Sequence, residues 1–445
     1  MTRPALALAA LLLMLPRPAA SQTPSTTLTI DRAVQETLTR NGALRAARAG
    51  ADQAAAEAQG AQSAWFPRVL VAESWQRGNQ PVFVFSTLLS SRQFAAENFL
   101  IDALNNPAPI GSFKTTVVVE QLLFDGGRQR AAIQGAGLRR DMAGLAVDEA
   151  RDDLALAATT AFGRILAAQA ARGAAEAGLA SSREDRTHAE RRRDAGMATD
   201  ADVLALAVHV ADLEQRLIQA EGDAAVARAE LNRFRGAPIE EAYDAIEPPA
   251  VAPSGPAESL EALLAEADLA RPELQRARAA ESLAESGRRQ ARSALVPQVA
   301  AQAAFDVAGT SFNDRASAWI VGGEIRWTFS TGGAELARLR GAAAGESRAH
   351  AEVEDARARV QVEVVTALRR LEAARARQAV GLAAVSQARE SERIIRDRFA
   401  AGLVGVGDVL RASSAVLDAT HQRMVAFVDA ISSAALLQRS LGRQP

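Results

Sequence analysis

Four segments of the chain alternate apolar and polar residues with a period of two, as strands with one apolar face do. In residues 317–329 one face carries Trp319, Val321, Ile325, Trp327 and Phe329, and the other carries Ala318, Glu324, Arg326 and Thr328. The same alternation sets Val117, Val119 and Leu123 against Thr116 and Glu120, and Val299, Ala301 and Phe305 against Gln298, Gln302 and Asp306. Each segment is about ten residues long, the length that a tilted strand needs to cross a bilayer. The pattern predicts membrane strands with apolar side chains outward and polar ones inward.

The first strand, which begins near Pro67, fits this pattern less well. Its apolar face contains Val69, Val71 and Trp75, but also Glu73. A carboxylate facing lipid at the bilayer centre would cost about 2 kcal/mol or less. Two explanations are open: the register differs here, or Glu73 lies near a membrane interface.

Long segments with helical composition follow the strands. Residues 128–193 and 334–399 are rich in Ala, Leu, Arg and Glu and contain no proline. At 1.5 Å per residue each would form about 100 Å of helix. Glycine-containing turns follow near 194–204 and 400–410, and second helices return to about 235 and 441. Because apolar positions recur about every 3.5 residues after the first turn, we expect coiled-coil hairpins. A shorter helix precedes the strands of each half, at about 31–64 and 258–294.

The chain is an internal duplication. An offset of 206 residues relates Gly126-Gly127 to Gly332-Gly333, and an offset of 230 relates Pro67 to Pro297. The first half therefore has about 24 additional residues before Gly126, and we expect them in an outward-facing loop within 77–113. We divide the chain into a signal peptide (1–21), a first repeat (22–236), a proline-rich linker or equatorial segment (237–257) and a second repeat (258–445).

The N-terminus predicts export from the cytoplasm. Arg3 precedes an apolar run of about 11 residues, and Ala19-Ala20-Ser21 offers a cleavage site before Gln22. No later run approaches 18 consecutive apolar residues, so helical membrane spans are not expected. The chain has no cysteine, which excludes disulfides and thiolate chemistry. The formal net charge of −2 gives no basic field for nucleic acid, and we predict no nucleic-acid partner.

Tryptophan placement supports the membrane interpretation. All four tryptophans lie in or beside the strands, as an aromatic membrane girdle would place them: Trp65, Trp75, Trp319 and Trp327. Four strands cannot close a barrel, and an open sheet edge cannot face lipid, so several copies must share one barrel. We interpret Gly126, Gly127, Gly332 and Gly333 as the junctions where the barrel wall becomes a helical tube, because glycine permits the sharp change in backbone direction.

At this point the sequence resembles the TolC-like outer membrane efflux protein family. The resemblance rests on the LFDGGR run, the duplicated strand-strand-helix-helix order and the paired G-x5-DVL turns, and it covers essentially the whole mature chain. It implies an α+β membrane protein of the bacterial outer membrane: a homotrimer with a twelve-stranded barrel, four strands per chain, continued by an α-helical periplasmic tunnel. It also implies an exit duct for efflux or type I secretion, coupled through a periplasmic adaptor to an inner membrane transporter.

The resemblance also assigns the two turns to the periplasmic tip. There the tunnel is expected to close at rest and the adaptor to dock, at Gly196, Met197, Gly402 and Leu403. Asp408 matches the first aspartate of the family's pore constriction, but Arg411 replaces the second. Asp202 matches a latching aspartate, while Phe399 and Val404 replace the tyrosine and arginine of that latch, so the latch must differ. Asp202 and Asp408 could equally cap the helices that follow, and the two roles are compatible.

Two other functions were weighed. An enzyme is not supported, because His188, His209, His350 and His421 are scattered over predicted helices without metal-ligand spacing, and no catalytic grouping or cofactor motif is present. The main alternative is a periplasmic coiled-coil adaptor or spacer protein. It would share the signal and the helical hairpins, but not the duplicated strands that hold all the tryptophans. The cargo is not indicated by the sequence.

Overall fold

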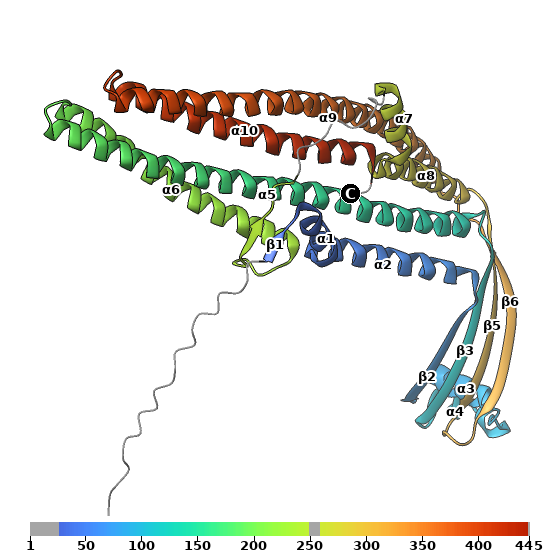
Figure 1. Ribbon diagram of the computed structural model, residues 1–445. Coiled ribbons are helices and arrows are strands. Elements are labelled where there is room, and N and C mark those ends of the chain that lie inside the picture. Colours follow the sequence, from blue (N-terminus) through green and yellow to red (C-terminus); the bar gives the residue numbers. More distant parts are fainter. Residues whose placement is uncertain (1–25, 249–258, 444–445) are drawn as a thin grey trace, which may run out of the picture. The chain divides into compact units, whose positions relative to one another are not determined.

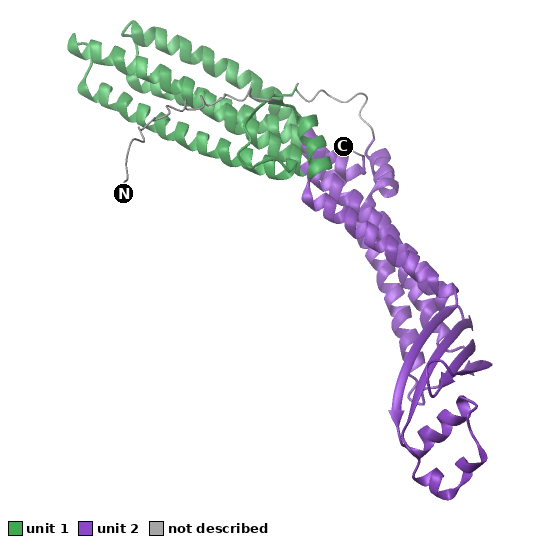
Figure 2. Ribbon diagram, turned by 90° about the horizontal axis from the view of Figure 1, so that it is seen from below, with its two compact units in different colours: residues 1–40, 157–252, 374–432 green, residues 41–156, 253–373, 433–445 purple. Residues whose placement is uncertain are grey.

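The computed structural model describes residues 26–248 and 259–443, so the predicted signal peptide and most of the linker's proline-rich part lie outside the described residues. The chain forms two compact units, coloured separately in Figure 2. Each unit combines segments from both halves of the sequence. One unit contains residues 41–156, 253–373 and 433–445, and the other contains residues 1–40, 157–252 and 374–432.

The first of these units contains the four predicted membrane strands. They are β2 (Arg68–Gly78), β3 (Ile110–Phe124), β5 (Gln298–Gly309) and β6 (Ala316–Arg326). They form one antiparallel sheet in the order β2-β3-β5-β6. β2 and β6 are therefore its two edges, and within the described residues neither edge pairs with a further strand.

Each strand of this sheet is joined directly to a helix of the same unit (Figure 1). α2 (Gly42–Gln62) leads through a short 3-10 turn into β2, and α8 (Pro272–Ser293) leads into β5. In the other direction, β3 continues into α5 (Arg128–Asp194) and β6 into α9 (Ala334–Ala400). The predicted long helices are thus confirmed to within one residue at each end.

The sheet register confirms the apolar and polar faces. Val71 lies opposite Val117, Val117 opposite Phe305, and Phe305 opposite Trp319, so these side chains share one face. The other face brings Lys114 within 3.1 Å of the Asp306 carboxylate, to which the Thr116 hydroxyl also donates. An irregularity between Leu122 and Phe124 shifts the register and leaves Leu123 without a paired residue on β5. Phe124, not Leu123, lies opposite Val299 on the apolar face.

Glu73 does lie on the apolar face, so the predicted register is correct there. It pairs across the strands with Thr115, whose hydroxyl donates to its carboxylate. The Arg315 guanidinium lies 3.2 Å from the same carboxylate and 4.0 Å from the Phe312 ring centroid. A hydrogen bond and an ion pair therefore compensate the Glu73 charge, and the Phe312 ring contacts the guanidinium of that ion pair.

The segment 77–113 is more ordered than the predicted loop. It contains two short helices, α3 (Pro81–Ser90) and α4 (Ile101–Asn105), with a 3-10 turn between them. The rings of Phe85, Phe94 and Phe99 form edge-to-face pairs at 4.8 and 4.9 Å. Gln93 fastens the segment to the β5–β6 connection by donating to Asp314 at 2.6 Å.

The second unit is mainly helical. It contains α1 (Ile30–Arg40), α6 (Asp200–Arg235), most of α10 (Val406–Leu441) and parts of α5 and α9. It also contains a small parallel sheet that the sequence did not predict, in which β1 (Thr26–Leu28) pairs with β4 (Tyr243–Ala245). Leu28, Phe162, Leu231 and the 4% exposed Tyr243 lie in its core.

The single helix predicted before the strands is two helices in each half, which corrects that prediction. In the first half Asn41 separates α1 from α2 in an extended conformation and accepts a hydrogen bond from the Ala43 amide at 2.8 Å. In the second half α7 (Leu260–Ala270) ends before Arg271, because Pro272 disfavours helical backbone at the residue before it.

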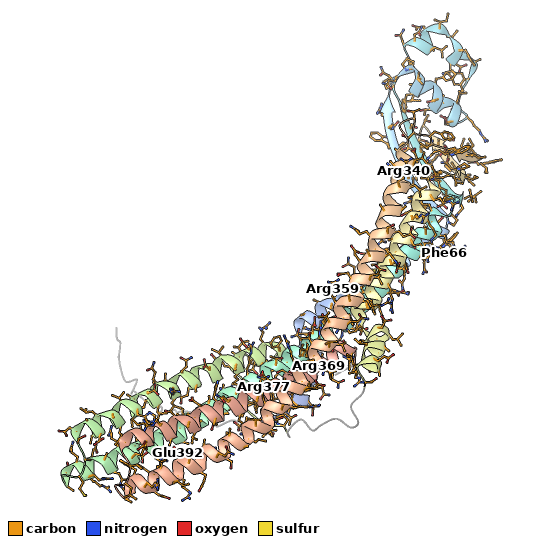
Figure 3. The ribbon with its side chains drawn as sticks, turned by 90° about the horizontal axis from the view of Figure 1, so that it is seen from above. Phe66, Arg340, Arg359, Arg369, Arg377 and Glu392 are labelled. Carbon is orange, nitrogen blue, oxygen red and sulfur yellow. The ribbon has the colours of Figure 1, made fainter. Side chains whose placement is uncertain are left out.

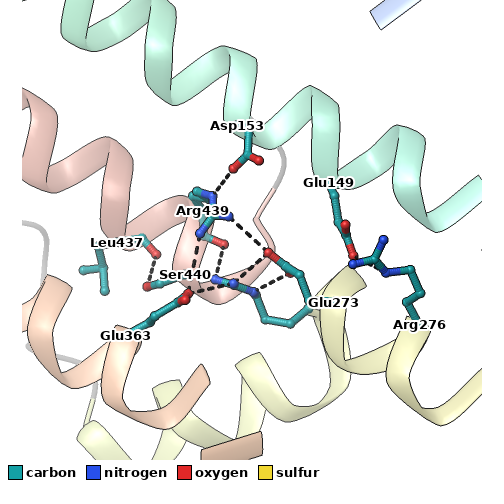
Figure 4. A network of polar contacts seen from close by, with 9 residues as sticks. Glu149, Asp153, Glu273, Arg276, Glu363, Leu437, Arg439 and Ser440 are labelled. Carbon is teal, nitrogen blue, oxygen red and sulfur yellow. Dashed lines mark hydrogen bonds and ion pairs between the residues drawn. The ribbon is translucent and has the colours of Figure 1, made fainter. Parts of the chain in front are cut away.

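Ion pairs join the end of α10 to α5, α8 and α9 in the sheet-containing unit (Figure 4). Arg271, whose side chain is 2% exposed, donates to Glu273 at 2.9 Å and to Glu363 at 2.7 Å. Arg439 reaches Glu273 at 3.1 Å and Asp153 of α5 at 2.6 Å. The shared carboxylates offset the cost of burying these guanidinium groups.

Two helices of the described residues, α5 and α10, contain an 18-residue window that is apolar enough for a membrane span by length and composition alone. Half of each window is buried within the protein. These windows are not uninterrupted apolar runs, because charged residues can occur within them. The sequence prediction, which considered only uninterrupted runs, therefore did not include them. Their burial is what helices packed on other helices require.

Candidate functional site

The strand-to-helix junctions contain three glycines with left-handed backbone. Gly126 and Gly127 have φ of +67° and +85°, and Gly333 has φ of +68°. Only glycine adopts this region without strain, so these three positions explain how the chain changes direction just before α5 and α9. Gly332 is not among the residues with positive φ, and a Cβ there would meet nothing within 4 Å. The two predicted junctions are therefore similar in position but not equivalent in geometry.

Asp125 completes the first junction. Its buried carboxylate accepts hydrogen bonds from the Gly127 amide at 3.0 Å and from the Gln129 amide at 2.7 Å. The Gln129 amide belongs to the first turn of α5 and the Gly127 amide directly precedes it, where free N–H groups need an acceptor. Thr331 occupies the corresponding place in the second half. Asp125 was not among the predicted site residues, although an acidic residue just before a helix is a recognisable capping signal.

All four tryptophans have exposed side chains on or beside the sheet. Trp65 and Trp327 flank its helix end, while Trp75 and Trp319 lie within the edge strands. Trp75 packs against Phe113, and Trp327 packs against Phe329 at a centroid distance of 4.5 Å. Exposed aromatic side chains in these places are typical of a membrane girdle.

The first interhelix turn is held by two capping motifs. Gly196, with φ of +74°, ends α5, and the Met197 amide donates to the Arg192 carbonyl at 2.8 Å. Thr199 caps α6: the Asp202 amide donates to its hydroxyl, and its own amide donates to the Asp202 carboxylate at 3.0 Å. These bonds hold the pKa of Asp202 below its ordinary value. Asp202 is thus the third helical residue of a capping box, not the cap itself.

The second interhelix turn also has a glycine at the end of its first helix, but it has no capping box. Gly402 has φ of +77°, and the Leu403 amide donates to the Arg398 carbonyl at 2.9 Å. Asp408 does not serve as a cap: its carboxylate accepts from Arg411 at 2.5 Å, one turn along α10. Asp408 and Arg411 therefore neutralise each other on the surface. Met197 and Leu403, predicted as adaptor-docking residues, are 64% and 73% exposed.

Phe399, predicted at the pore, has its ring in a small core near the two turns. The ring is 7% exposed and clusters with Ala189 of α5, Leu206 of α6 and Val409 of α10. Val404 packs against the same cluster. All four helices thus meet here, and Phe399 contributes packing where the resemblance would place a latching hydroxyl.

Arg192 joins the two hairpins and was not predicted. Its guanidinium donates to the Phe399 carbonyl at 2.5 Å and lies 5.4 Å from the Phe399 ring centroid. A Cβ at Gly402 would lie 3.1 Å from the same guanidinium. Arg192 lies within the run Arg191-Arg192-Arg193, and nothing in the sequence indicates which of the three reaches α9.

Comparison with known proteins agrees with this geometry. The chain matches the family described as outer membrane efflux protein over residues 33–237 and 263–443. A search of curated proteins found no match. The fold is similar to that of the outer-membrane channel OprN, with a TM-score of 0.79 and 22% identity over 94% of this chain and 91% of that one. It is also similar to VceC of Vibrio cholerae, with a TM-score of 0.77 and 20% identity over 93% of this chain and 96% of that one.

A third solved structure, CusC, covers almost all of both chains. The comparison gives a TM-score of 0.78 at 16% identity over 99% of this chain and 98% of the other. Identities this low establish the fold alone, whereas the family match spans most of the sequence. The chain therefore belongs to the outer membrane efflux protein family and is an efflux channel of the outer membrane.

Proposed function

We propose that three copies of this chain form one exit duct, with a twelve-stranded barrel in the outer membrane and a helical tunnel in the periplasm. The observation that carries the proposal is the sheet with two open edges, β2 and β6. Unpaired N–H and C=O groups cannot face lipid, so each edge needs a partner strand. If β2 of each copy pairs with β6 of the next copy, the same contact repeats around a closed ring. Every edge strand then has a partner.

The two faces of the sheet support the same arrangement. The face with Val71, Val117, Phe305 and Trp319 suits lipid, and the face with Lys114, Thr116 and Asp306 suits a water-filled pore. Since every strand continues into a helix, closing the barrel would also bring the helices into a ring. This interpretation assigns α5 and α9, each 67 residues long, to the tunnel wall.

At the far ends of these helices, the two turns form the proposed periplasmic tip. There the exposed side chains of Met197 and Leu403 offer apolar contacts to the helical hairpins of an adaptor, through which an inner membrane transporter would deliver cargo. Gly196 and Gly402 set the shape of this surface by ending their helices. Asp202, Asp408, Arg411 and Phe399 are proposed to determine how the tip closes and which ions pass.

The mass of the assembly tests the proposal. The mature chain would be extracted from outer membranes in mild detergent, and its protein mass measured by light scattering corrected for bound detergent. We expect three chain masses. A detergent-bound monomer would contradict the shared barrel, because four strands leave two edges unpaired. A protein released without detergent would instead fit the adaptor or spacer function, which the family match does not support.

A further inference from the structure

An open cleft of about 860 Å³ lies at the first strand-to-helix junction, between the first turns of α5 and the last turns of α8. The two backbones approach closely at its floor, where a Cβ on Gly126 would lie 3.2 Å from the Ser293 carbonyl oxygen. Trp65 contributes to the lining from the 3-10 turn that follows α2. The cleft is thus built by three segments that meet beside the sheet.

The lining of this cleft is strongly cationic. It includes Arg130 of α5 and Arg289 and Arg292 of α8, the last two on one side of the helix because they are three residues apart. None of the lining residues is acidic. Arg289 has a partner in Glu285 at 3.4 Å, whereas in the described parts of the chain no ion pair is formed by Arg130 or Arg292. The neighbouring Asp125 carboxylate is engaged by the Gly127 and Gln129 amides.

We propose that this cleft binds the phosphate of an anionic phospholipid from the periplasmic leaflet of the outer membrane. Guanidinium groups match phosphate oxygens in charge and in paired hydrogen-bond geometry, so Arg130 and Arg292 supply the contacts. The location rests on the proposed function in one respect: the strands cross the membrane, which puts their helix ends at the level of the periplasmic headgroups.

Aromatic side chains beside the cleft support a lipid as the occupant. Trp65 is 56% exposed, and Phe66, at the boundary between helix and sheet (Figure 3), is 70% exposed. Rings of this kind prefer the membrane–water interface, where a lipid's glycerol backbone and upper chain would lie against them. A free phosphate ion would use the arginines but gain nothing from these rings.

The order of the sheet argues against a second copy as the occupant. The arginines of the cleft lie on the helices joined to β3 and β5, which are the two central strands, and only Trp65 comes from the segment that leads into the edge strand β2. Neighbouring copies would join through the edge strands β2 and β6, away from this place. Trimer formation is therefore expected to leave the cleft accessible to lipid.

Native mass spectrometry of the delipidated trimer tests the proposal. The protein would be titrated with dioleoyl phosphatidylglycerol and, in parallel, with dioleoyl phosphatidylcholine, which has the same chains but no net charge. We expect the wild-type protein to bind phosphatidylglycerol roughly tenfold more tightly, and the double variant Arg130→Ala/Arg292→Ala to lose that preference. The matched control is Arg340→Ala, which removes an exposed arginine of α9 near the sheet (Figure 3) and is expected to bind like the wild type.

Three results would overturn the assignment: equal binding of the two lipids, an unchanged preference in the double variant, or displacement of the lipid by excess inorganic phosphate, which would make the cleft a free-anion site. Should the double variant not assemble, Arg130→Gln and Arg292→Gln are measured separately, and each is expected to weaken binding roughly threefold. A trimer that does not discriminate between lipids refutes only this site. A chain that forms no trimer refutes the proposed function instead.

Discussion

At the scale of single residues, three of the junction glycines form a graded series. Gly126 combines a left-handed backbone with close neighbours, since its Cβ would lie 3.0 Å from the Cβ of Val296. Gly127 has a left-handed backbone and open space, and Gly332 has open space without positive φ. These positions are all glycine in the sequence, but they differ in backbone conformation and in the space available for a side chain.

This series predicts unequal effects of adding a methyl group. We expect Gly126→Ala to destabilise the protein by about 2–4 kcal/mol, from backbone strain plus the clash with Val296. Gly127→Ala should cost about 1–2 kcal/mol from strain alone, and Gly332→Ala should stay within about 0.5 kcal/mol. Thermal unfolding of the purified assembly in detergent measures the order. Equal losses at all three positions would show that the junction geometry described here does not control stability.

Asp152 gives a prediction with a defined pH dependence. Burial, together with the nearby Glu273 and Asp148, raises the pKa of this α5 carboxyl to about 6 against the opposing effect of Arg151 and Arg439. The folded state therefore holds the proton more tightly than the unfolded state. Folding stability contributed by this group is complete below about pH 4 and is lost as the pH rises through about 6.

Asp152→Asn removes this dependence. We expect the variant to be more stable than the wild type by about 1–2 kcal/mol at pH 8, and the difference to vanish near pH 3.5, below the unfolded-state pKa. Asp153→Asn is the control, because it removes the partner of Arg439 at 2.6 Å and should not stabilise the protein at pH 8. Thermal midpoints of all three proteins at both pH values decide the matter. A stabilisation of Asp152→Asn that is equal at both pH values would contradict the assignment.

At the scale of elements, the sequence predicted what periodicity and composition encode. The strands alternate, the long helices lack proline, and the turns contain glycine, so each could be placed within a few residues. The breaks at Asn41 and Arg271 were missed because an asparagine cap inside a helical pattern and a proline at a helix start both look like minor irregularities. β1 and β4 are three residues each, and most of the first repeat separates them in the sequence. No local sequence pattern predicts pairing between strands that are so short and so far apart.

At the proposed tip, the identity of a residue does not predict which contacts its side chain forms. Family resemblance identified the positions of Asp202, Phe399, Asp408 and Arg411, but not the bonds they form here. Arg192 connects α5 to α9 by reaching a backbone carbonyl, and any residue at position 399 supplies that acceptor. A hydrogen bond from a side chain to a distant backbone carbonyl places no requirement on the identity of the accepting residue. Such a contact therefore cannot be predicted from the residue type at that position.

Removal of this contact is expected to loosen the tip. A hydrogen bond from a charged group contributes about 1.5–3 kcal/mol, so Arg192→Ala should raise the ratio of open to closed tips by roughly tenfold or more. Single-channel recording in planar bilayers would show this as larger or more frequent openings. The matched control is Arg193→Ala, whose side chain pairs with Asp194 and Asp200 within its own hairpin and does not reach the other one. Equal traces for the two variants would mean that Arg192 does not hold the tip closed.

At the scale of the whole molecule, the lack of cysteine allows a direct test of the shared barrel. In the proposed ring, β2 of one copy runs antiparallel to β6 of the next. Cysteine at Ala72 of β2, combined in turn with cysteine at Ala318, Ile320 or Gly322 of β6, would sample the possible registers. Paired strands bring opposing Cβ atoms to about 4.5–5.5 Å, within reach of a disulfide. We expect at least one pair to give covalent trimers on denaturing gels after mild oxidation.

The control for this experiment uses the central strands. Val118 of β3 and Ala304 of β5 lie opposite each other within one chain. Cysteines there can close only an internal disulfide and should leave the chain monomeric on the gel. If the edge pairs also give only monomers while the internal pair oxidises fully, β2 and β6 are not neighbours across copies. The edges would then need another partner, because the same N–H and C=O groups cannot remain unpaired in lipid.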